Sequence, residues 1–318
     1  MAYDVALVGE GETQVKLAMT ARDCPICGSS SSTLFAEENF DPETWDSFAF
    51  ASRKLPEYMH YRLVECTSCD LVYANPAPDG GSLGEAYRQA AYDSAEEAAF
   101  AARTYAGFLP SILSRLPRRG RALDIGAGDG AFVEQLVRAG FSDPVGVEPS
   151  TAPIESARPE IRKLIRQGLF SAGDFEPQSL SLVTCFQTIE HLPDPGEMFR
   201  QVHGLLEEGG AIFVVGHNRR ALSARILGLK SPIFDIEHLQ LISPSSLRRA
   251  LESTGYTDVS VKTVRNRYPL KYWARLFPLP EGVKSRVLGF LGRNPMGALP
   301  ISLPAGNMAA IGYRRSEP

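Results

Sequence analysis

Four of the five cysteines in this 318-residue chain form two pairs with C-x-x-C spacing. Cys24 pairs with Cys27, and Cys66 pairs with Cys69. A turn with two intervening residues aims two thiolates at one point, and two such turns supply the four ligands of a tetrahedral zinc ion. Because four thiolates leave no position for water, the spacing predicts a structural zinc site. A redox-active pair is the alternative chemistry.

A glycine-rich turn is the second group of residues suited to chemistry. Residues 126–130 read GAGDG after the apolar run 122–125, and Glu148 ends the next apolar run. Glycines let a ligand approach the backbone closely, and an acid at the end of a second strand can hold ribose hydroxyls. A dinucleotide is the runner-up ligand, but its turn has the spacing G-x-G-x-x-G. The carboxylates of Asp124 and Asp129 would repel a pyrophosphate, whereas they suit a cationic sulfonium.

Three histidines are candidates for a general base, the role that histidine fills most often. His191 directly follows Glu190 in the loop after the apolar run 180–186, and His217 follows the next strand pattern. Both would lie at the carboxyl edge of a parallel sheet, where such sheets bind ligands. His238 precedes a predicted helix start and is the third candidate. For each histidine, the alternative is a structural role in its loop.

Strand and helix patterns alternate from residue 122 to residue 264. This alternation predicts an α/β fold in which helices cover both faces of a parallel sheet. Strands are expected at 122–125, 144–148, 180–186 and 211–216, and helices at 131–139, 156–165 and 195–206.

Charge and apolar runs limit the partners and the compartment. The net charge of −4 disfavours nucleic acid as a partner. No apolar run is long enough to cross a bilayer, and no basic stretch followed by an apolar one opens the chain. We therefore expect a cytoplasmic protein, in a reducing compartment that disfavours disulfides.

Several motifs, in order along the chain, resemble the class I S-adenosylmethionine-dependent methyltransferases. They include Leu123-Asp-Ile-Gly-Ala-Gly-Asp-Gly, Gly146-Val-Glu-Pro-Ser and Cys185-Phe-Gln-Thr-Ile-Glu-His-Leu-Pro-Asp-Pro. The resemblance implies a Rossmann-like methyltransferase sheet. It also implies contacts with S-adenosylmethionine by Asp124, Gly126, Gly128 and Gln187 near the methionine part, by Glu148 at the ribose and by Leu169 near the adenine.

Cysteine turns ahead of such a core look similar to the arrangement in bacterial sugar and natural-product methyltransferases. This resemblance implies O-methylation of a hydroxyl on a sugar or another polar metabolite, with a small molecule or a glycan as acceptor. In those enzymes a Glu-His pair after the fourth strand contacts the substrate or acts as base, which points to Glu190 and His191. Alternatives are C-methylation of a nucleotide-linked sugar, methylation of ribosomal RNA, and a non-enzymatic cofactor-binding scaffold.

The chain divides into four segments. Residues 1–80 hold a zinc-ribbon-like module, 81–118 form a helical connector, 119–264 form the methyltransferase core, and 265–318 form a basic and apolar segment. We expect the last segment to complete the sheet with a strand at 308–313 and to cover the acceptor site. Its basic and large apolar residues indicate either a solvated basic face over ordinary core packing or contact with an anionic membrane surface or a lipid-linked acceptor.

Overall fold

The computed structural model describes residues 3–7, 15–39, 58–88, 92, 95–276 and 280–315. Residues 277–279, which belong to the basic segment, lie outside the described residues. Among the residues that are described, no helix is both long enough and apolar enough to span a bilayer.

A sheet of seven strands forms the centre of the molecule, in the order β13-β16-β11-β10-β7-β8-β9. Only β16 runs antiparallel, and it pairs with both β11 and β13. This arrangement confirms the expected α/β class and the Rossmann-like methyltransferase sheet. The strands are β7 (Arg121–Ile125), β8 (Asp143–Glu148), β9 (Ile165–Gln167), β10 (Leu180–Phe186), β11 (Leu206–His217), β13 (Tyr256–Thr263) and β16 (Asn307–Arg314).

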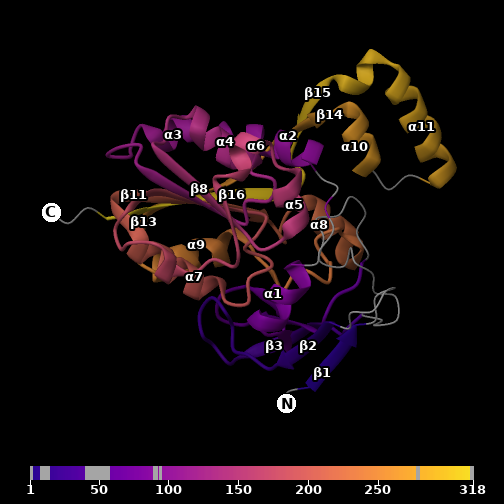
Figure 1. Cartoon of the computed structure of the whole chain (residues 1–318). Helices are drawn as coiled ribbons and strands as arrows, with labels where there is room; N and C mark the ends of the chain where they lie inside the picture. Colours follow the sequence, from indigo (N-terminus) through magenta and orange to yellow (C-terminus); the bar gives the residue numbers. More distant parts are fainter. Residues whose placement is uncertain are drawn as a thin grey trace.

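Helices cover both faces of this sheet (Figure 1). On one face α7 (Pro195–Leu205) and α9 (Pro244–Ser253) share a core cluster with the strands. On the other face lie α2 (Ala95–Ala106), α3 (Leu109–Leu113) and α4 (Ala131–Arg138). β10 is buried on both faces, so its sequence is mostly apolar, as is usual for central parallel strands, and its two polar residues, Ser181 and Thr184, are fully buried.

The expected single helix over 156–165 is wrong. The structure has α5 (Thr151–Ser156) and α6 (Pro159–Arg162), and Ile165 already belongs to β9. Arg158 has a ψ of 143°, which is extended backbone. A proline clashes with a helical residue before it, so Pro159 can begin a helix but cannot continue one.

The N-terminal module contains two small sheets. One has the order β1-β2-β6, and the other has the order β12-β5-β4-β3. The strands are β1 (Tyr3–Leu7), β2 (Val15–Thr20), β3 (Ser32–Ala36), β4 (Leu63–Cys66), β5 (Val72–Ala74), β6 (Ala77–Pro78) and β12 (Gln240–Leu241). Since β12 comes from the core segment, the module and the core share a sheet.

The C-terminal segment contributes a helical extension and the strand β16. The hairpin of β14 (Asn266–Pro269) and β15 (Pro300–Leu303) carries α10 (Leu270–Leu276), α11 (Glu281–Arg293) and η4 (Pro295–Ala298) away from the sheet (Figure 1). Ion pairs from Lys271 to Glu96 and from Arg275 to Glu97 join α10 to α2. Coverage of the acceptor site by this segment stays a prediction. The remaining elements are α1 (Gly80–Arg88), α8 (Leu222–Leu227), η2 (Ala172–Asp174) and η3 (Gly228–Lys230).

Candidate functional site

The glycine turn lies between β7 and α4, where the order of strands in the sheet changes direction. The chain runs from β7 outward through β8 and β9, and then crosses back to β10 on the other side of β7. Such a switch point leaves a crevice at the carboxyl ends of the strands, which is where open α/β sheets bind ligands. Gly126, Gly128 and Gly130 have φ values of 73°, 55° and 76°. A side chain at Gly126 would overlap Thr188, so glycine is needed there for space as well as for backbone conformation.

Two buried acids flank this turn. Glu148 accepts hydrogen bonds from the backbone N–H groups of Gly128 and Ser150, each at 2.9 Å, and burial raises its pKa. Asp124 accepts a 2.6 Å hydrogen bond from the Thr184 hydroxyl, and burial raises its pKa to about 7. Glu148 thus lies at the turn, where the resemblance requires a ribose ligand, whereas the Asp124 carboxyl is turned to β10.

The next loop along the edge carries Leu169. The Gly168 N–H donates to the Glu148 carbonyl at 2.9 Å, so this loop adjoins the acid that ends β8. The Leu169 side chain is 54% exposed and reaches Gly84 of α1. The expected place of Leu169 beside an adenine ring stays a prediction.

Gln187 follows β10 and has a left-handed φ of 51°. Its amide nitrogen donates to the Tyr105 hydroxyl at 3.3 Å. Its amide oxygen is buried, with no hydrogen-bond partner among the described residues. A buried polar atom without a hydrogen-bond partner lowers the stability of the fold unless a bound ligand supplies the missing hydrogen bond. Gln187 therefore fits a contact with a bound molecule.

The structure brings together His191, His217 and His238, which are far apart in the sequence. The ring centroids of His191 and His238 are 5.0 Å apart, and those of His217 and His238 are 5.1 Å apart. They come from the loop after β10, the end of β11 and the segment before β12. We call these three residues the histidine cluster.

Each ring in the histidine cluster is held by a partner at Nδ1. Nδ1 of His217 is 3.0 Å from the Asn307 side-chain oxygen, and Nδ1 of His238 is 2.9 Å from the Ile233 carbonyl. Nδ1 of His191 lies 2.9 Å from the Tyr87 hydroxyl. These contacts fix the rings in place.

Glu190 lies at the centre of this network and is fully buried. One carboxylate oxygen accepts the backbone N–H of His217, and its carbonyl accepts N–H groups from Leu239 and Gln240. The other carboxylate oxygen has no hydrogen-bond partner among the described residues. Glu190 therefore connects the three loops that carry the histidines. Its second carboxylate oxygen is left to accept a hydrogen bond from a bound molecule.

Electrostatics keep His191 and His238 neutral near pH 7. Burial, reinforced by the other two rings, lowers the pKa of His191 well below its ordinary value. Burial and the neighbouring His217 lower the pKa of His238 to about 4. Neutral imidazoles can accept a proton, which is the state that a general base requires.

The four sulfurs of Cys24, Cys27, Cys66 and Cys69 lie within 4.8 Å of one another, and we call them the cysteine cluster. Two Sγ–Sγ distances are 3.4 Å for Cys24 to Cys69 and 3.6 Å for Cys27 to Cys66. Zinc–sulfur bonds of about 2.3 Å place tetrahedral sulfurs about 3.8 Å apart, whereas a disulfide is about 2.05 Å long. All four thiols are free. The donor set therefore fits a tetrahedral zinc ion.

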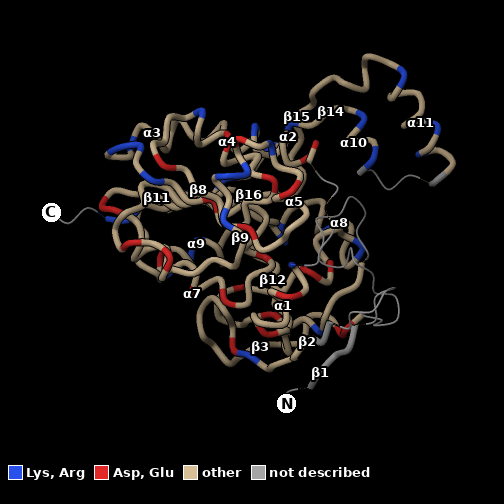
Figure 2. The backbone as a smooth tube through the Cα atoms, in the orientation of Figure 1, with Lys and Arg blue, Asp and Glu red and all other residues tan. Residues whose placement is uncertain are grey.

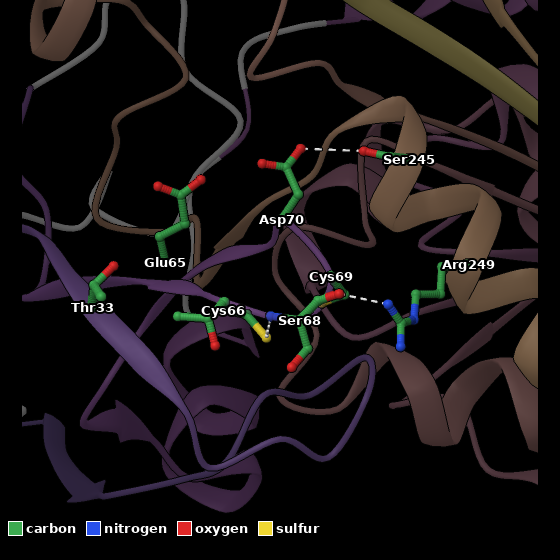
Figure 3. A pocket seen from close by; sticks show the side chains of 9 residues that line it. Thr33, Glu65, Cys66, Ser68, Cys69, Asp70, Ser245 and Arg249 are labelled. Atoms are coloured by element: carbon green, nitrogen blue, oxygen red, sulfur yellow. Dashed lines mark hydrogen bonds between the residues drawn. The ribbon is translucent and has the colours of Figure 1, made fainter.

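The second cysteine turn is tied to the core by Asp70, which has a φ of 65°. Asp70 pairs with Arg219 and Arg220, which follow β11, and accepts a 3.2 Å hydrogen bond from Ser245 of α9. A pocket of about 550 Å³ lies beside this turn, and Arg249 reaches across it to the Ser68 carbonyl (Figure 3). This polar pocket adjoins the cysteine cluster, not the glycine turn.

Arg22 joins the module to the loops of the histidine cluster. Its guanidinium donates to the carbonyls of Ala74 at 2.9 Å, Pro193 at 2.7 Å and Leu239 at 2.9 Å. Burial lowers the pKa of Arg22 to about 10, which still leaves it charged. One partly buried cation thus holds the segments that follow His191 and His238.

Sequence reasoning missed four residues of the site: Arg22, Tyr87, Glu237 as a neighbour of His191, and Asn307. Tyr87 lies in the expected helical connector, and Asn307 directly precedes the expected final strand, 308–313. The pattern around Tyr87 carries no functional signal. Asn307 could have been inferred only from the pairing of β16 with β11, which places it opposite His217.

A family model described as a methyltransferase domain matches residues 97–261, which is more than half of the chain. The chain belongs to this methyltransferase family. The match covers the glycine turn and the histidine cluster and begins in α2, after the cysteine cluster.

Similar curated proteins of this methyltransferase class share a name. Ubiquinone biosynthesis O-methyltransferases of Aeromonas salmonicida and Coxiella burnetii are 28% and 27% identical to the chain over 42% and 47% of its length. The matched regions are 62% and 68% of those proteins. Across the first three such relatives, the chain spans between 48% and 63% of their length.

Solved structures similar to the chain are more distant in sequence. The YcgJ protein of Bacillus subtilis is 18% identical, with a TM-score of 0.47 over 68% of this chain and 100% of that one. A possible histamine N-methyltransferase of Thermotoga maritima is also 18% identical, with a TM-score of 0.45 over 69% of this chain and 91% of that one. These likenesses are too weak to support an inference about the acceptor.

Proposed function

We propose that this methyltransferase moves the methyl group of S-adenosylmethionine to a hydroxyl oxygen of a sugar or another polar acceptor. The observation that carries the proposal is the histidine cluster at the carboxyl edge of β10 and β11. Bound S-adenosylmethionine supplies an electrophilic methyl group on a sulfonium. The chain has to hold the acceptor in line with that methyl group and to remove the hydroxyl proton.

The histidine cluster would remove the proton. As the oxygen–carbon bond forms and the carbon–sulfur bond breaks, a neutral imidazole takes the proton and a neutral thioether leaves. His191 is the proposed base because it lies in the loop after β10, beside Gln187. The Glu190 carboxylate, which acts electrostatically on His238, would stabilise the positive charge that the cluster gains.

Buried polar atoms at the carboxyl edge of β10 support a polar, hydroxyl-bearing molecule as the methyl acceptor. One oxygen of Gln187 and one of Glu190 are buried without a partner among the described residues. Both are hydrogen-bond acceptors, so they suit hydroxyl donors of a bound polyol. The relatives' name, which specifies O-methylation, supports oxygen as the acceptor atom.

The same proposal assigns a structural zinc ion to the cysteine cluster. Zinc held by four thiolates has no open position, so it would cross-link the two cysteine turns and take no part in methyl transfer. The module that it stabilises would hold the loops of the site through Arg22 and Asp70.

A membrane surface is the proposed partner of the C-terminal extension. Lys284, Arg286 and Arg293 lie on α11 together with Val283 and Phe290, which are 48% and 59% exposed (Figure 2). Basic residues beside exposed apolar ones suit an anionic lipid interface. Co-sedimentation with anionic vesicles at low salt, lost with neutral vesicles and in Lys284→Gln/Arg286→Gln, would support this partner. Equal sedimentation of the variant would refute it.

Cofactor binding is the first test of the proposed function. Titration calorimetry should show binding of S-adenosylmethionine by wild type, loss in Gly126→Val, and a weakening of about tenfold or more in Glu148→Ala. The exposed acid Glu176 offers a matched control, Glu176→Ala, with unchanged affinity. Tighter binding of NAD than of S-adenosylmethionine would contradict the assignment.

Acceptor identity requires a direct experiment. Labelled S-adenosylmethionine and fractionated host extract should give a labelled product that mass spectrometry identifies as an O-methyl ether. A product labelled on carbon would favour C-methylation of a nucleotide-linked sugar, and labelled RNA would favour methylation of ribosomal RNA. Stoichiometric binding without turnover on any fraction would indicate a scaffold.

A further inference from the structure

Two members of the histidine cluster share a carboxylate neighbour. Nδ1 of His191 lies 3.8 Å from Oε2 of Glu237, and Nε2 of His238 lies 3.9 Å from Oε1 of the same carboxylate. One donor atom of each residue lies within 4.8 Å of the other two. Donors about 2.1 Å from a tetrahedral ion are about 3.4 Å apart, so small side-chain rotations would close this set around a metal.

The contacts of His238 favour metal binding, whereas Nδ1 of His191 already lies 2.9 Å from the Tyr87 hydroxyl and 3.1 Å from the Glu237 carbonyl, so His191 would have to turn to offer a nitrogen to the ion. The Nδ1 atom of His238 faces the Ile233 carbonyl, which can only accept, so Nδ1 carries the hydrogen and Nε2 is unprotonated. This is the arrangement of a metal-ligating histidine, whose second nitrogen donates to a carbonyl or carboxylate. His217, with Nδ1 on the Asn307 oxygen, has the same orientation and lies against His238.

Glu190 supplies an independent observation. It is fully buried beside the cluster, and one of its carboxylate oxygens has no hydrogen-bond partner among the described residues. Buried carboxylates are normally paired with a cation or fully hydrogen-bonded. A cation among these rings would supply the missing positive charge.

The site is accessible as well as preorganised. The side chains of His191 and Glu237 are 16% and 14% exposed, whereas that of His238 is 6% exposed. The side chains of His191 and Glu237 are therefore partly exposed to solvent, which gives an ion an entry path.

We propose that His191, Glu237 and His238 bind one divalent first-row transition metal ion at the acceptor end of the cleft. Two imidazoles and a carboxylate are the protein ligands of zinc in several hydrolases and of iron in non-haem oxygenases, with positions left open for substrate. The ligand for the open position is a hydroxyl or alkoxide oxygen.

This inference rests on the proposed function for its role in the reaction. A hydroxyl bound to a divalent ion loses its proton more readily, so the ion would orient and activate the acceptor oxygen. His191 would then be a ligand, and His217 would be the imidazole that takes the proton.

Cobalt binding to the full-length chain that holds one equivalent of zinc, in the cysteine cluster, tests the site without any need for turnover. Calorimetry with Co²⁺ should show one saturable site, and absorption should show d–d bands without the charge-transfer bands of a thiolate ligand. Glu237→Gln, which keeps the side-chain shape, should weaken Co²⁺ binding by at least about tenfold, since even second-shell changes cost about 10- to 100-fold. His238→Ala should abolish it. His203→Ala, on α7 against Tyr256, is the matched control and should bind like wild type.

The outcomes separate this site from the proposed function. Absence of saturable Co²⁺ binding by wild type, or equal binding by Glu237→Gln folded as judged by circular dichroism, would overturn the metal site. If the protein still transfers methyl groups in that case, the proposed O-methylation remains valid and His191 is its base. Co²⁺ binding that needs Glu237, in a protein that transfers no methyl group, would uphold the site and overturn the function.

Discussion

The cysteine cluster and the histidine cluster are assembled in different ways. The cysteines arrive in two local turns, and each turn is complete within a few residues of chain. The histidines come from three separate segments and meet only because β10, β11 and β12 bring their ends together. A metal site built from local turns can be recognised from spacing alone, whereas a site built by topology becomes visible only when the sheet is known.

The surroundings of the two clusters also differ, because in the part of the chain that the structure describes only the histidine cluster adjoins buried polar atoms without hydrogen-bond partners. Cys24, Cys66 and Cys69 belong to the main hydrophobic core cluster. The histidine cluster adjoins Gln187 and Glu190, each with a buried oxygen that lacks a partner among the described residues. The first arrangement serves stability, and the second is typical of a site that waits for a ligand.

The largest expected effect is on the cysteine cluster. Cys66→Ser should lower zinc content from about one equivalent to near zero and should destabilise the protein by several kcal/mol, because the ion's binding free energy is folding free energy. Elemental analysis and thermal unfolding measure both. Cys185→Ser is the control, because that buried cysteine lies in β10 outside the cluster and should leave zinc content unchanged. Full zinc content and an unchanged Tm in Cys66→Ser would show that the cysteine cluster is not a structural zinc site.

The next effect is on catalysis. His191→Ala should lower kcat by about 10² to 10⁴, the usual contribution of a positioned base. Zinc bound by the cysteine cluster and the Kd for S-adenosylmethionine should stay close to wild type. His217→Ala should be milder where His191 is the base, whereas a loss as large as that of His191→Ala would favour His191 as a metal ligand. A His191→Asn variant with normal turnover would return His191 to a structural role in its loop.

A smaller effect concerns pH and the histidine cluster. His238 has a pKa of about 4 in the folded chain against 6.5 in its ordinary state, so the unfolded chain binds more protons below pH 6.5. Stability from this group is complete above pH 6.5 and is lost as pH falls through 4, by up to about 3 kcal/mol. His238→Gln should flatten the fall in Tm over this window. Parallel curves for variant and wild type would mean that the imidazole is not buried in its neutral form.

The smallest effect tests whether the two clusters are coupled. Arg22→Met removes the guanidinium that bonds the Pro193 and Leu239 carbonyls, and a displaced loop would lower kcat by about tenfold, since misplacement by 1 Å can cost more. Zinc content and the Kd for S-adenosylmethionine should not change. Arg22→Lys should recover part of the loss, because it keeps one donor. Equal turnover in all three proteins would show that the clusters work independently.

The fold was largely predictable because its central strands are apolar on both faces. The run 180–186 coincides with β10, and the expected final strand 308–313 lies within β16. Short elements were not predictable: β12 has two residues and exists only because β5 offers it an edge. Pro159 lies within the expected helix 156–165, and its presence in the sequence could have predicted the break between α5 and α6.

The site was predictable where one motif holds the residues and unpredictable where packing selects them. The glycine turn, Glu148 and the Glu190-His191 pair follow from local sequence. Arg22 looks like any surface arginine, and its role depends on three carbonyls from three segments.

The place of β16 in the sheet has a consequence during protein synthesis. β11 leaves the ribosome about 90 residues before Asn307, and it pairs with β16 from Ala211 to His217. At about 5–20 residues per second, the apolar edge of β11 stays open for about 5 to 20 seconds in the nascent chain. An open strand edge is a template for aggregation, so slower translation should lower the yield of folded protein unless a chaperone shields it. Because Asn307 also orients His217, the acceptor side of the site is the last part of the molecule to be completed.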